Sequence, residues 1–159
     1  MNAFTRLVPV LVLSLVGCSG EKFAPVAGVV TYRGTPLADA TVVFTPESPT
    51  EGVRAATATT GPDGTYQLQT NLPGGVTKPG AAHGKFKVTV SKFVPPSGIS
   101  EEEYNKKLQA EQDPNRPYSP NSVVPAKVEM IPKEYSDSQA TKIEATVTGG
   151  ANEVKIEIP

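Results

Sequence analysis

Apolar residues recur at every second position through several short segments of this chain, and this alternation restricts its fold more than any other feature. Side chains on a β-strand point alternately to two faces, so the spacing is typical of strands that bury one face. Parallel sheets covered on both faces show continuous apolar runs instead. We therefore predict an all-β fold, an antiparallel β-sandwich of about seven strands. The alternating segments are 26–34, 40–46, 65–70, 85–92, 142–148 and 153–159.

The connections between these segments contain the residues that tight turns need. In the stretch 61–64, Gly-Pro-Asp-Gly, the proline fixes φ and the second glycine tolerates a positive φ. We expect Asp63 to shape this hairpin and not to bind calcium. A further segment, 53–60, has mostly small side chains, and we expect it to form an edge strand or to occupy a shallow position.

The stretch 93–132 departs from the alternating pattern and holds seven prolines, so we interpret it as an insertion in the sandwich. One short helix is predicted inside it, over residues 101–112, because Ser100 and Glu103 have the spacing of a capping box. Its apolar stripe is thin, only Tyr104 and a leucine one turn later. The favoured interpretation is a surface helix that packs lightly on the sandwich, and the alternative is an arm that docks a partner.

The first 17 residues have the charge and length of a signal peptide. Arg6 precedes the apolar run 7–17, which is too short to span a bilayer. Residues 15–18, Leu-Val-Gly-Cys, resemble the lipobox of bacterial lipoproteins. The resemblance implies that the chain is cut before Cys18 and that this lone cysteine carries a diacylglycerol, often with a third acyl chain on its amine. At about 0.8 kcal/mol per buried methylene, such an anchor is effectively permanent.

This reading divides the chain into a signal peptide, 1–17, a lipidated cysteine with its tether, 18–25, and a domain, 26–159. Ser19 follows the cysteine, where an aspartate favours retention in the inner membrane of diderm bacteria. The resemblance therefore implies a lipid anchor in the outer membrane, with the domain facing the periplasm or the exterior of the cell envelope.

Spaced motifs in the domain resemble the carboxypeptidase regulatory-like, transthyretin-like (prealbumin-like) domains of small bacterial lipoproteins. Gly-x-Pro-Leu ends the first strand, Val and Phe occupy the second, an Asp-Gly hairpin precedes a tyrosine, and a Gly-x-Phe-x-Val strand follows. The matching positions are Gly34, Pro36, Leu37, Val42, Phe44, Asp63, Gly64, Tyr66, Gly84, Phe86 and Val88. The resemblance implies an Ig-like β-sandwich that is non-catalytic, and folds of this kind serve many roles.

Groups that could carry chemistry are few in this sequence. His83 is the only histidine, and we expect it to be solvated in a loop. The aspartates 63, 113 and 137 are scattered along the chain. We predict no catalytic residues, no metal site and no cofactor. The formal net charge of −1 gives no electrostatic footprint for nucleic acid, so no nucleic-acid partner is expected.

We expect a lipid-anchored, non-enzymatic β-sandwich module of the bacterial envelope, with a binding or structural role. Its partners would be the membrane, through lipid on Cys18, and an envelope protein or polysaccharide. Tyr104 and Tyr118 are candidate ligand contacts because neither follows the alternating pattern. The alternatives are a hydrolase or hydrolase accessory subunit, which would need carboxylates, tyrosines and His83 to converge in one pocket, and a carbohydrate-binding or cell-wall-binding module, which would show exposed aromatics in line.

Overall fold

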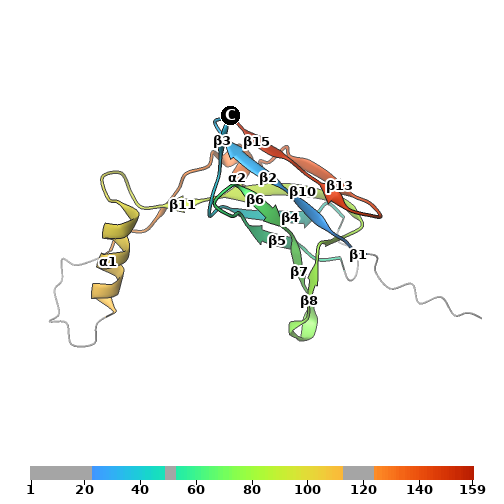
Figure 1. Ribbon diagram of the computed structural model, residues 1–159, viewed down its shortest axis with the longest axis horizontal. Coiled ribbons are helices and arrows are strands. Elements are labelled where there is room, and N and C mark those ends of the chain that lie inside the picture. Colours follow the sequence, from blue (N-terminus) through green and yellow to red (C-terminus); the bar gives the residue numbers. More distant parts are fainter. Residues whose placement is uncertain (1–22, 49–52, 113–123) are drawn as a thin grey trace, which may run out of the picture.

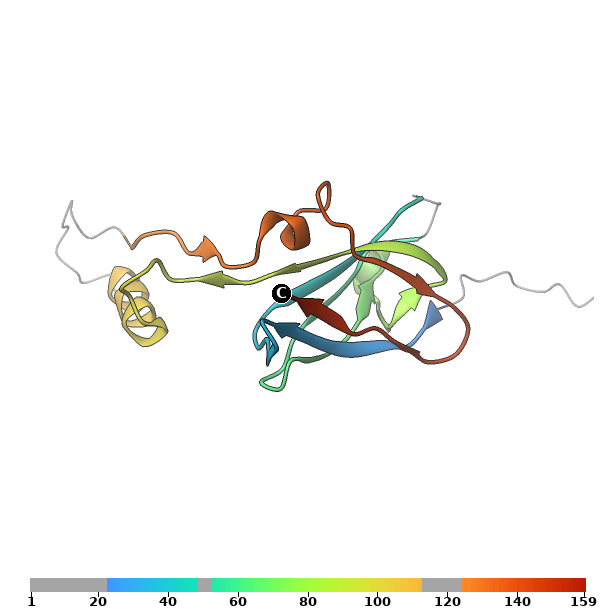
Figure 2. The ribbon, with the colours of Figure 1, turned by 90° about the horizontal axis from the view of Figure 1, so that it is seen from above.

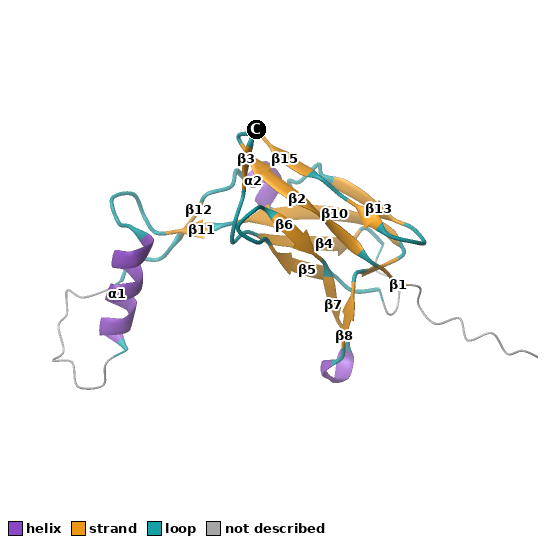
Figure 3. Cartoon of the chain, viewed as in Figure 1, coloured by secondary structure: helices purple, strands orange, loops and turns teal. Residues whose placement is uncertain are grey.

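Two β-sheets pack face to face in this protein, and an arm extends from one end of them (Figure 1). This architecture is seen in a computed structural model that describes residues 23–48, 53–112 and 124–159. Figure 3 shows that strands make up the body, while the longer helix, α1 (Glu101–Glu111), stands at the tip of the arm. The predicted all-β sandwich is confirmed.

The larger sheet has six strands, each antiparallel to its neighbours. Its longest strand, β10, buries Phe86, Val88 and Val90 and turns its lysines to the other face, as the alternation predicts. The order across the sheet is β13 (Glu144–Val147), β10 (Gly84–Ser91), β4 (Thr41–Pro46), β5 (Ala56–Thr59), β7 (Gln69–Asn71) and β8 (Thr77–Pro79).

The smaller sheet is built around β2 (Val26–Tyr32), which pairs with four short strands. β3 (Thr35–Pro36) and β6 (Thr65–Gln67) run antiparallel to it. β14 (Asn152–Glu153) and β15 (Ile156–Ile158) run parallel to it. The antiparallel pairing predicted from the alternation therefore holds for β3 and β6 but is wrong for the two C-terminal strands. Alternation shows that one face of a strand is buried, and a short strand with one buried face can pair in either direction.

The core lies between the two sheets and centres on three aromatic rings. The ring of Phe44 lies 6.0 Å from that of Phe86 and 6.5 Å from that of Tyr66, in tilted arrangements. Phe44 and Phe86 are fully buried, and so are aliphatic side chains from both sheets. Burial of this area supplies the main driving force for folding.

β5 corrects one expectation from the sequence. Segment 53–60 was expected at an edge of the sheet or in a shallow position, but β5 lies inside the sheet, between β4 and β7. Its small side chains have a packing reason: Ala56 is the cross-strand neighbour of Phe44 and is fully buried. A small residue beside a large ring lets the core close without overpacking.

Gly28 and Tyr66 both approach the C-terminal segment of the smaller sheet at Val154. The Tyr66 hydroxyl donates a hydrogen bond of 2.8 Å to the carbonyl oxygen of Val154, which directly follows β14. A Cβ on Gly28 would lie 1.8 Å from that same oxygen, so the close approach needs glycine at this position. Burial raises the pKa of Tyr66 above its ordinary value.

The sandwich begins earlier than the sequence indicates. Phe23 and Ala24 form β1 (Phe23–Ala24), which pairs antiparallel with β9 (Ala81–Ala82). Ala24 is buried in the core. The predicted tether 18–25 is therefore corrected at its end, because two of its residues belong to the fold.

The described parts of the insertion, 93–112 and 124–132, form an arm that continues the line of β10. After Lys92 the chain forms β11 (Phe93–Val94), which pairs antiparallel with the returning β12 (Val128–Glu129). Both Figure 1 and Figure 2 place α1 at the far end of this arm, away from the sandwich, whereas β1 lies at the opposite end. The favoured expectation of a helix that packs on the sandwich is therefore wrong. The short α2 (Lys133–Ser136) follows, beside β10.

Candidate functional site

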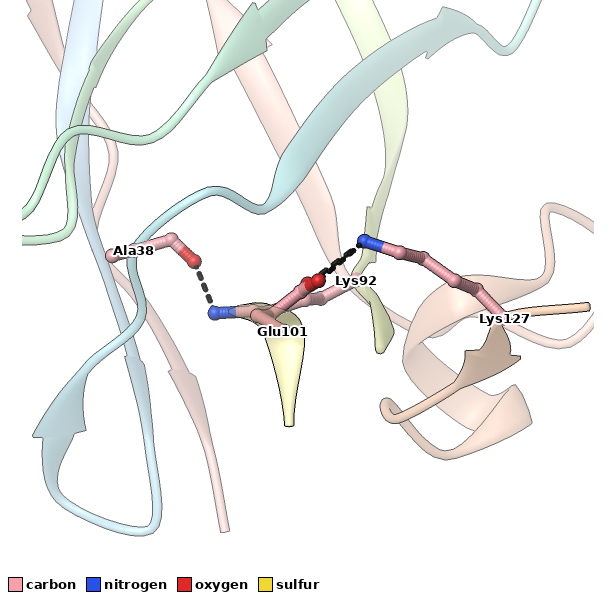
Figure 4. Close-up of polar contacts among 4 residues, drawn as sticks. All are labelled: Ala38, Lys92, Glu101 and Lys127. Carbon is pink, nitrogen blue, oxygen red and sulfur yellow. Dashed lines mark hydrogen bonds and ion pairs between the residues drawn. The ribbon is translucent and has the colours of Figure 1, made fainter. Parts of the chain in front are cut away.

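The base of the arm is fixed to the sandwich by Lys92 and Glu129. The Lys92 ammonium donates a hydrogen bond of 2.7 Å to the carbonyl oxygen of Ala38, as Figure 4 shows. The Glu129 carboxylate accepts from the backbone N–H groups of Lys92 and Ile131, at 2.9 and 3.0 Å. Because one carboxylate joins the outgoing and returning segments, the arm leaves the sandwich in a defined direction.

The tip of the arm is the helix α1, which Lys127 of the returning segment contacts. Ser100 caps α1, and its hydroxyl oxygen accepts from the Glu103 N–H at 3.1 Å, as the capping box predicts. Lys127 pairs with both carboxylate oxygens of Glu101, at 2.8 and 3.0 Å (Figure 4). The same ammonium lies 5.2 Å from the centre of the Tyr104 ring, in a cation–π arrangement.

Tyr104 was predicted as a candidate ligand contact, and the structure gives it another role. It is the buried residue of α1, with only 6% of its surface exposed, and Lys127 covers its ring. Little of the ring is left for a ligand in this arrangement. The other two predicted site residues, Cys18 and Tyr118, lie outside the described residues.

The neck of the arm exposes two large apolar side chains. Phe93 is 57% exposed and Val128 is 48% exposed. In the β11–β12 register Phe93 pairs with Glu129 and Val94 with Val128, so Phe93 and Val128 lie on opposite faces of the ribbon. The neck therefore offers an apolar group on each face, and not one continuous patch.

Near β1, a hairpin protrudes from the side of the sandwich (Figure 1). The hairpin connects β7 to β8 through the short 3-10 helix η1 (Pro73–Gly75). The Lys78 ammonium on β8 lies 4.7 Å from the centre of the Phe23 ring on β1. Val76, at the tip, is 53% exposed. The Pro-Gly-Gly turn at this tip is a recognisable signal in the sequence, from which a hairpin could have been predicted here.

His83 and Asp63 lie in different connections of the fold: His83 directly precedes β10, and Asp63 lies in the turn before β6. His83 lines a hollow of about 190 Å³ with Glu47 and Lys85, at the start of β10. Asp63 shapes its hairpin as predicted: its carboxylate accepts from the backbone N–H and the hydroxyl of Thr65, at 3.1 and 2.6 Å. These bonds hold the pKa of Asp63 below its ordinary value. Within the described ranges, no three His, Cys, Asp or Glu side chains gather as a metal site would require.

A second hollow, of about 620 Å³, opens over β2 and β6. Thr65, Gln67 and Glu153 line it with polar groups, and Tyr66 also lines it, with its hydroxyl bonded to Val154.

In the part of the chain that the structure describes, no helix is long and apolar enough to cross a membrane.

Comparison with known proteins adds little to this geometry. No family model matches the chain, and no curated protein matches it. Among solved structures, a DUF3823 family protein from Parabacteroides merdae ATCC 43184 is similar, with a TM-score of 0.38 and 14% sequence identity. The match covers 87% of this chain and 47% of that one, so the chain spans about half the length of that protein. The sandwich assignment therefore depends on the strand topology itself.

Proposed function

We propose that this protein is a lipid-anchored, non-catalytic β-sandwich of the bacterial cell envelope that presents the arm 93–132 to a partner. The observation that carries the proposal is the placement of two features. The N-terminal strand β1, to which the lipidated segment leads, lies at one end of the long axis, and α1 lies at the other (Figure 1). A chain attached at the first end would display the second far from the membrane.

The anchor in this proposal comes from the lipobox resemblance of residues 15–18. Two or three acyl chains on Cys18 would hold the protein at a membrane without a spanning helix. The outer membrane is the proposed location, because Ser19 replaces the aspartate that favours inner-membrane retention.

Side-chain contacts hold the arm at its base and at its tip. Long loops without a role are uncommon in compact domains. This insertion is pinned at its base by Lys92 and Glu129 and at its tip by Lys127, which supports a function that needs a defined shape. The proposed partner is an envelope protein or polysaccharide that contacts the arm.

We also propose that the sandwich belongs with the carboxypeptidase regulatory-like, transthyretin-like domains. The residues that carry this resemblance serve turns and the core here. Gly34 and Gly64 have positive φ values of 76° and 75°, while Leu37, Phe44 and Phe86 are buried. Residues of these kinds explain a fold and supply no reacting group, which supports a non-catalytic module.

The test of the anchor is the intact mass and detergent partition of the protein, expressed with its signal in a diderm bacterium, beside Cys18→Ser. We expect the wild type to begin at Cys18, to carry the mass of a diacylglycerol and to enter the detergent phase. The variant should lack all three properties. A wild type that stays unmodified and water-soluble would overturn the proposal.

A further inference from the structure

The β7–β8 hairpin is fixed to the strand where the chain enters the sandwich. Lys78 covers the Phe23 ring at 4.7 Å, and Gly80, just after β8, lies against Ala24 so closely that a Cβ would fall 1.9 Å from the Ala24 carbonyl oxygen. Figure 1 shows the hairpin protruding from the sandwich near β1. The position of β1 relative to a membrane would therefore also set the position of the hairpin.

The length of chain before β1 limits how far the sandwich can stand from an anchored cysteine. Four residues lie between Cys18 and Phe23, so five steps of about 3.3–3.6 Å each reach at most about 18 Å. The headgroup region on each side of a bilayer is itself about 5–8 Å thick. An anchored chain would thus hold β1 and its neighbours close to the lipid surface.

The tip of the hairpin has the chemistry of a lipid-facing loop. The Leu72 N–H donates to the Val76 carbonyl oxygen at 2.8 Å and closes the loop, which leaves Val76 53% exposed. Between Asp63 and Glu101 the sequence has no acidic residue, so the hairpin carries only the positive charge of Lys78. An exposed apolar side chain next to a lysine suits the boundary between headgroups and acyl chains, especially of anionic lipids.

We propose that the tip of this hairpin, residues 72–77, rests on the lipid surface that holds the acylated Cys18, with Val76 at the level of the headgroups. The inference rests on the proposed lipid anchor and adds a second contact, which fixes the orientation of the sandwich. Lys78 lies beside the tip, where anionic phosphate groups of the lipids would be in reach.

The experiment uses the absence of tryptophan from this chain. Val76→Trp creates one fluorescent probe at the hairpin tip, and Val128→Trp creates a matched probe at a similarly exposed valine on the arm. Both lipidated full-length proteins are placed in vesicles of phosphatidylethanolamine and phosphatidylglycerol at about 3:1, with or without lipids brominated on the upper acyl chain. Brominated lipids quench a tryptophan only when it reaches the membrane.

We expect Val76→Trp to shift its emission to the blue and to lose about half of it to brominated lipid, because an interfacial side chain lies about 5–10 Å deep at the headgroup boundary. Val128→Trp should emit as in water and be unquenched. A lipidated, vesicle-bound Val76→Trp protein that is no more quenched than Val128→Trp would overturn this inference alone. An intact mass without diacylglycerol would overturn the proposed anchor, and this inference with it.

The role of Lys78 has its own test on the same probe. Quenching of Val76→Trp should be greater in vesicles that contain phosphatidylglycerol than in vesicles of phosphatidylcholine alone, and Lys78→Gln should remove most of that difference. Lys142→Gln, an exposed lysine next to β13, is the matched control and should leave it unchanged. A response to phosphatidylglycerol that survives Lys78→Gln would contradict the role of this lysine.

Discussion

The sandwich and the arm of this protein are held together by different interactions. In the sandwich, Phe44, Phe86 and their neighbours are fully buried between two sheets. In α1 the buried residue is Tyr104, and Lys127 covers its ring and pairs with Glu101 at the surface. Because hydrophobic stabilisation scales with buried apolar area, nearly all of the free energy of unfolding belongs to the sandwich. We therefore expect substitutions in the arm to lower the free energy of unfolding less than substitutions in the core.

The largest effect is expected from the centre of the core. Phe44→Ala should lower the free energy of unfolding by about 3–5 kcal/mol, because it removes a buried ring and leaves a cavity. Tyr104→Ala, the corresponding change in the arm, should shift the urea midpoint of the sandwich far less. If Phe44→Ala does not fold, Phe44→Leu gives a smaller loss that can be measured. Equal losses from Phe44 and Tyr104 variants would break the comparison.

A substitution at Gly28 should lower the free energy of unfolding nearly as much, although it removes no side chain. Gly28→Ala brings a Cβ within 1.8 Å of the Val154 carbonyl oxygen, so β14 and β15 must move from β2. We expect a loss of at least about 2 kcal/mol, measured by urea unfolding. Gly149→Ala is the control, because its Cβ would make only an ordinary contact of 3.8 Å with His83. A Gly28→Ala protein as stable as this control would contradict the packing described.

The hydroxyl of Tyr66 makes a smaller contribution that depends on pH. Tyr66→Phe keeps the ring and loses the hydrogen bond to Val154, at a cost of about 1 kcal/mol. Burial raises the pKa of Tyr66 above its ordinary value of 10.0, so above pH 10 the unfolded chain loses a proton that the folded protein keeps. Stability supplied by Tyr66 is therefore complete below pH 10 and declines as the pH rises beyond it.

The difference in unfolding free energy between the wild type and Tyr66→Phe should thus narrow from about pH 8 to about pH 11. Urea unfolding of both proteins at the two pH values measures it, and other titrating groups cancel because both proteins share them. A difference that widens with pH would contradict a raised pKa of Tyr66 in the folded protein.

The smallest loss of unfolding free energy is expected for a substitution of Lys127, whose main effect should be confined to α1. Lys127→Ala removes the ion pair with Glu101 and uncovers Tyr104, at a cost of about 0–1 kcal/mol, because the pair is partly exposed. Amide hydrogen exchange should quicken in α1 and stay unchanged in β10. Lys106→Ala, on the exposed side of α1, is the control. Faster exchange in β10 as well would show that arm and sandwich unfold together.

Local patterns in the sequence predicted the local elements well. The alternation of Phe86, Val88 and Val90 identified β10, and the capping box at Ser100 identified the start of α1. The role of Asp63 in its hairpin was also predicted, because an aspartate that bonds the residue two positions later leaves a recognisable signal.

Features that depend on distant partners could not be predicted in the same way. Nothing within segment 53–60 reveals that Phe44 needs a small neighbour there, so β5 was expected at an edge. The thin stripe of α1 was assigned to the sandwich, but Lys127, which covers Tyr104, comes from the far side of the insertion. The turn of the β7–β8 hairpin has a recognisable signal in the sequence, but the position of its exposed Val76 near β1 depends on the fold.

The continuity of β10 with the arm determines how the molecule would respond to a mechanical load. The chain passes from β10 into β11 in one line, as Figure 2 shows. A pull on the arm against a fixed N-terminus would run along β10, whose ladder bonds to β4 and β13 lie across the direction of the force. All of these bonds would share the load at once, in shear, instead of opening one after another.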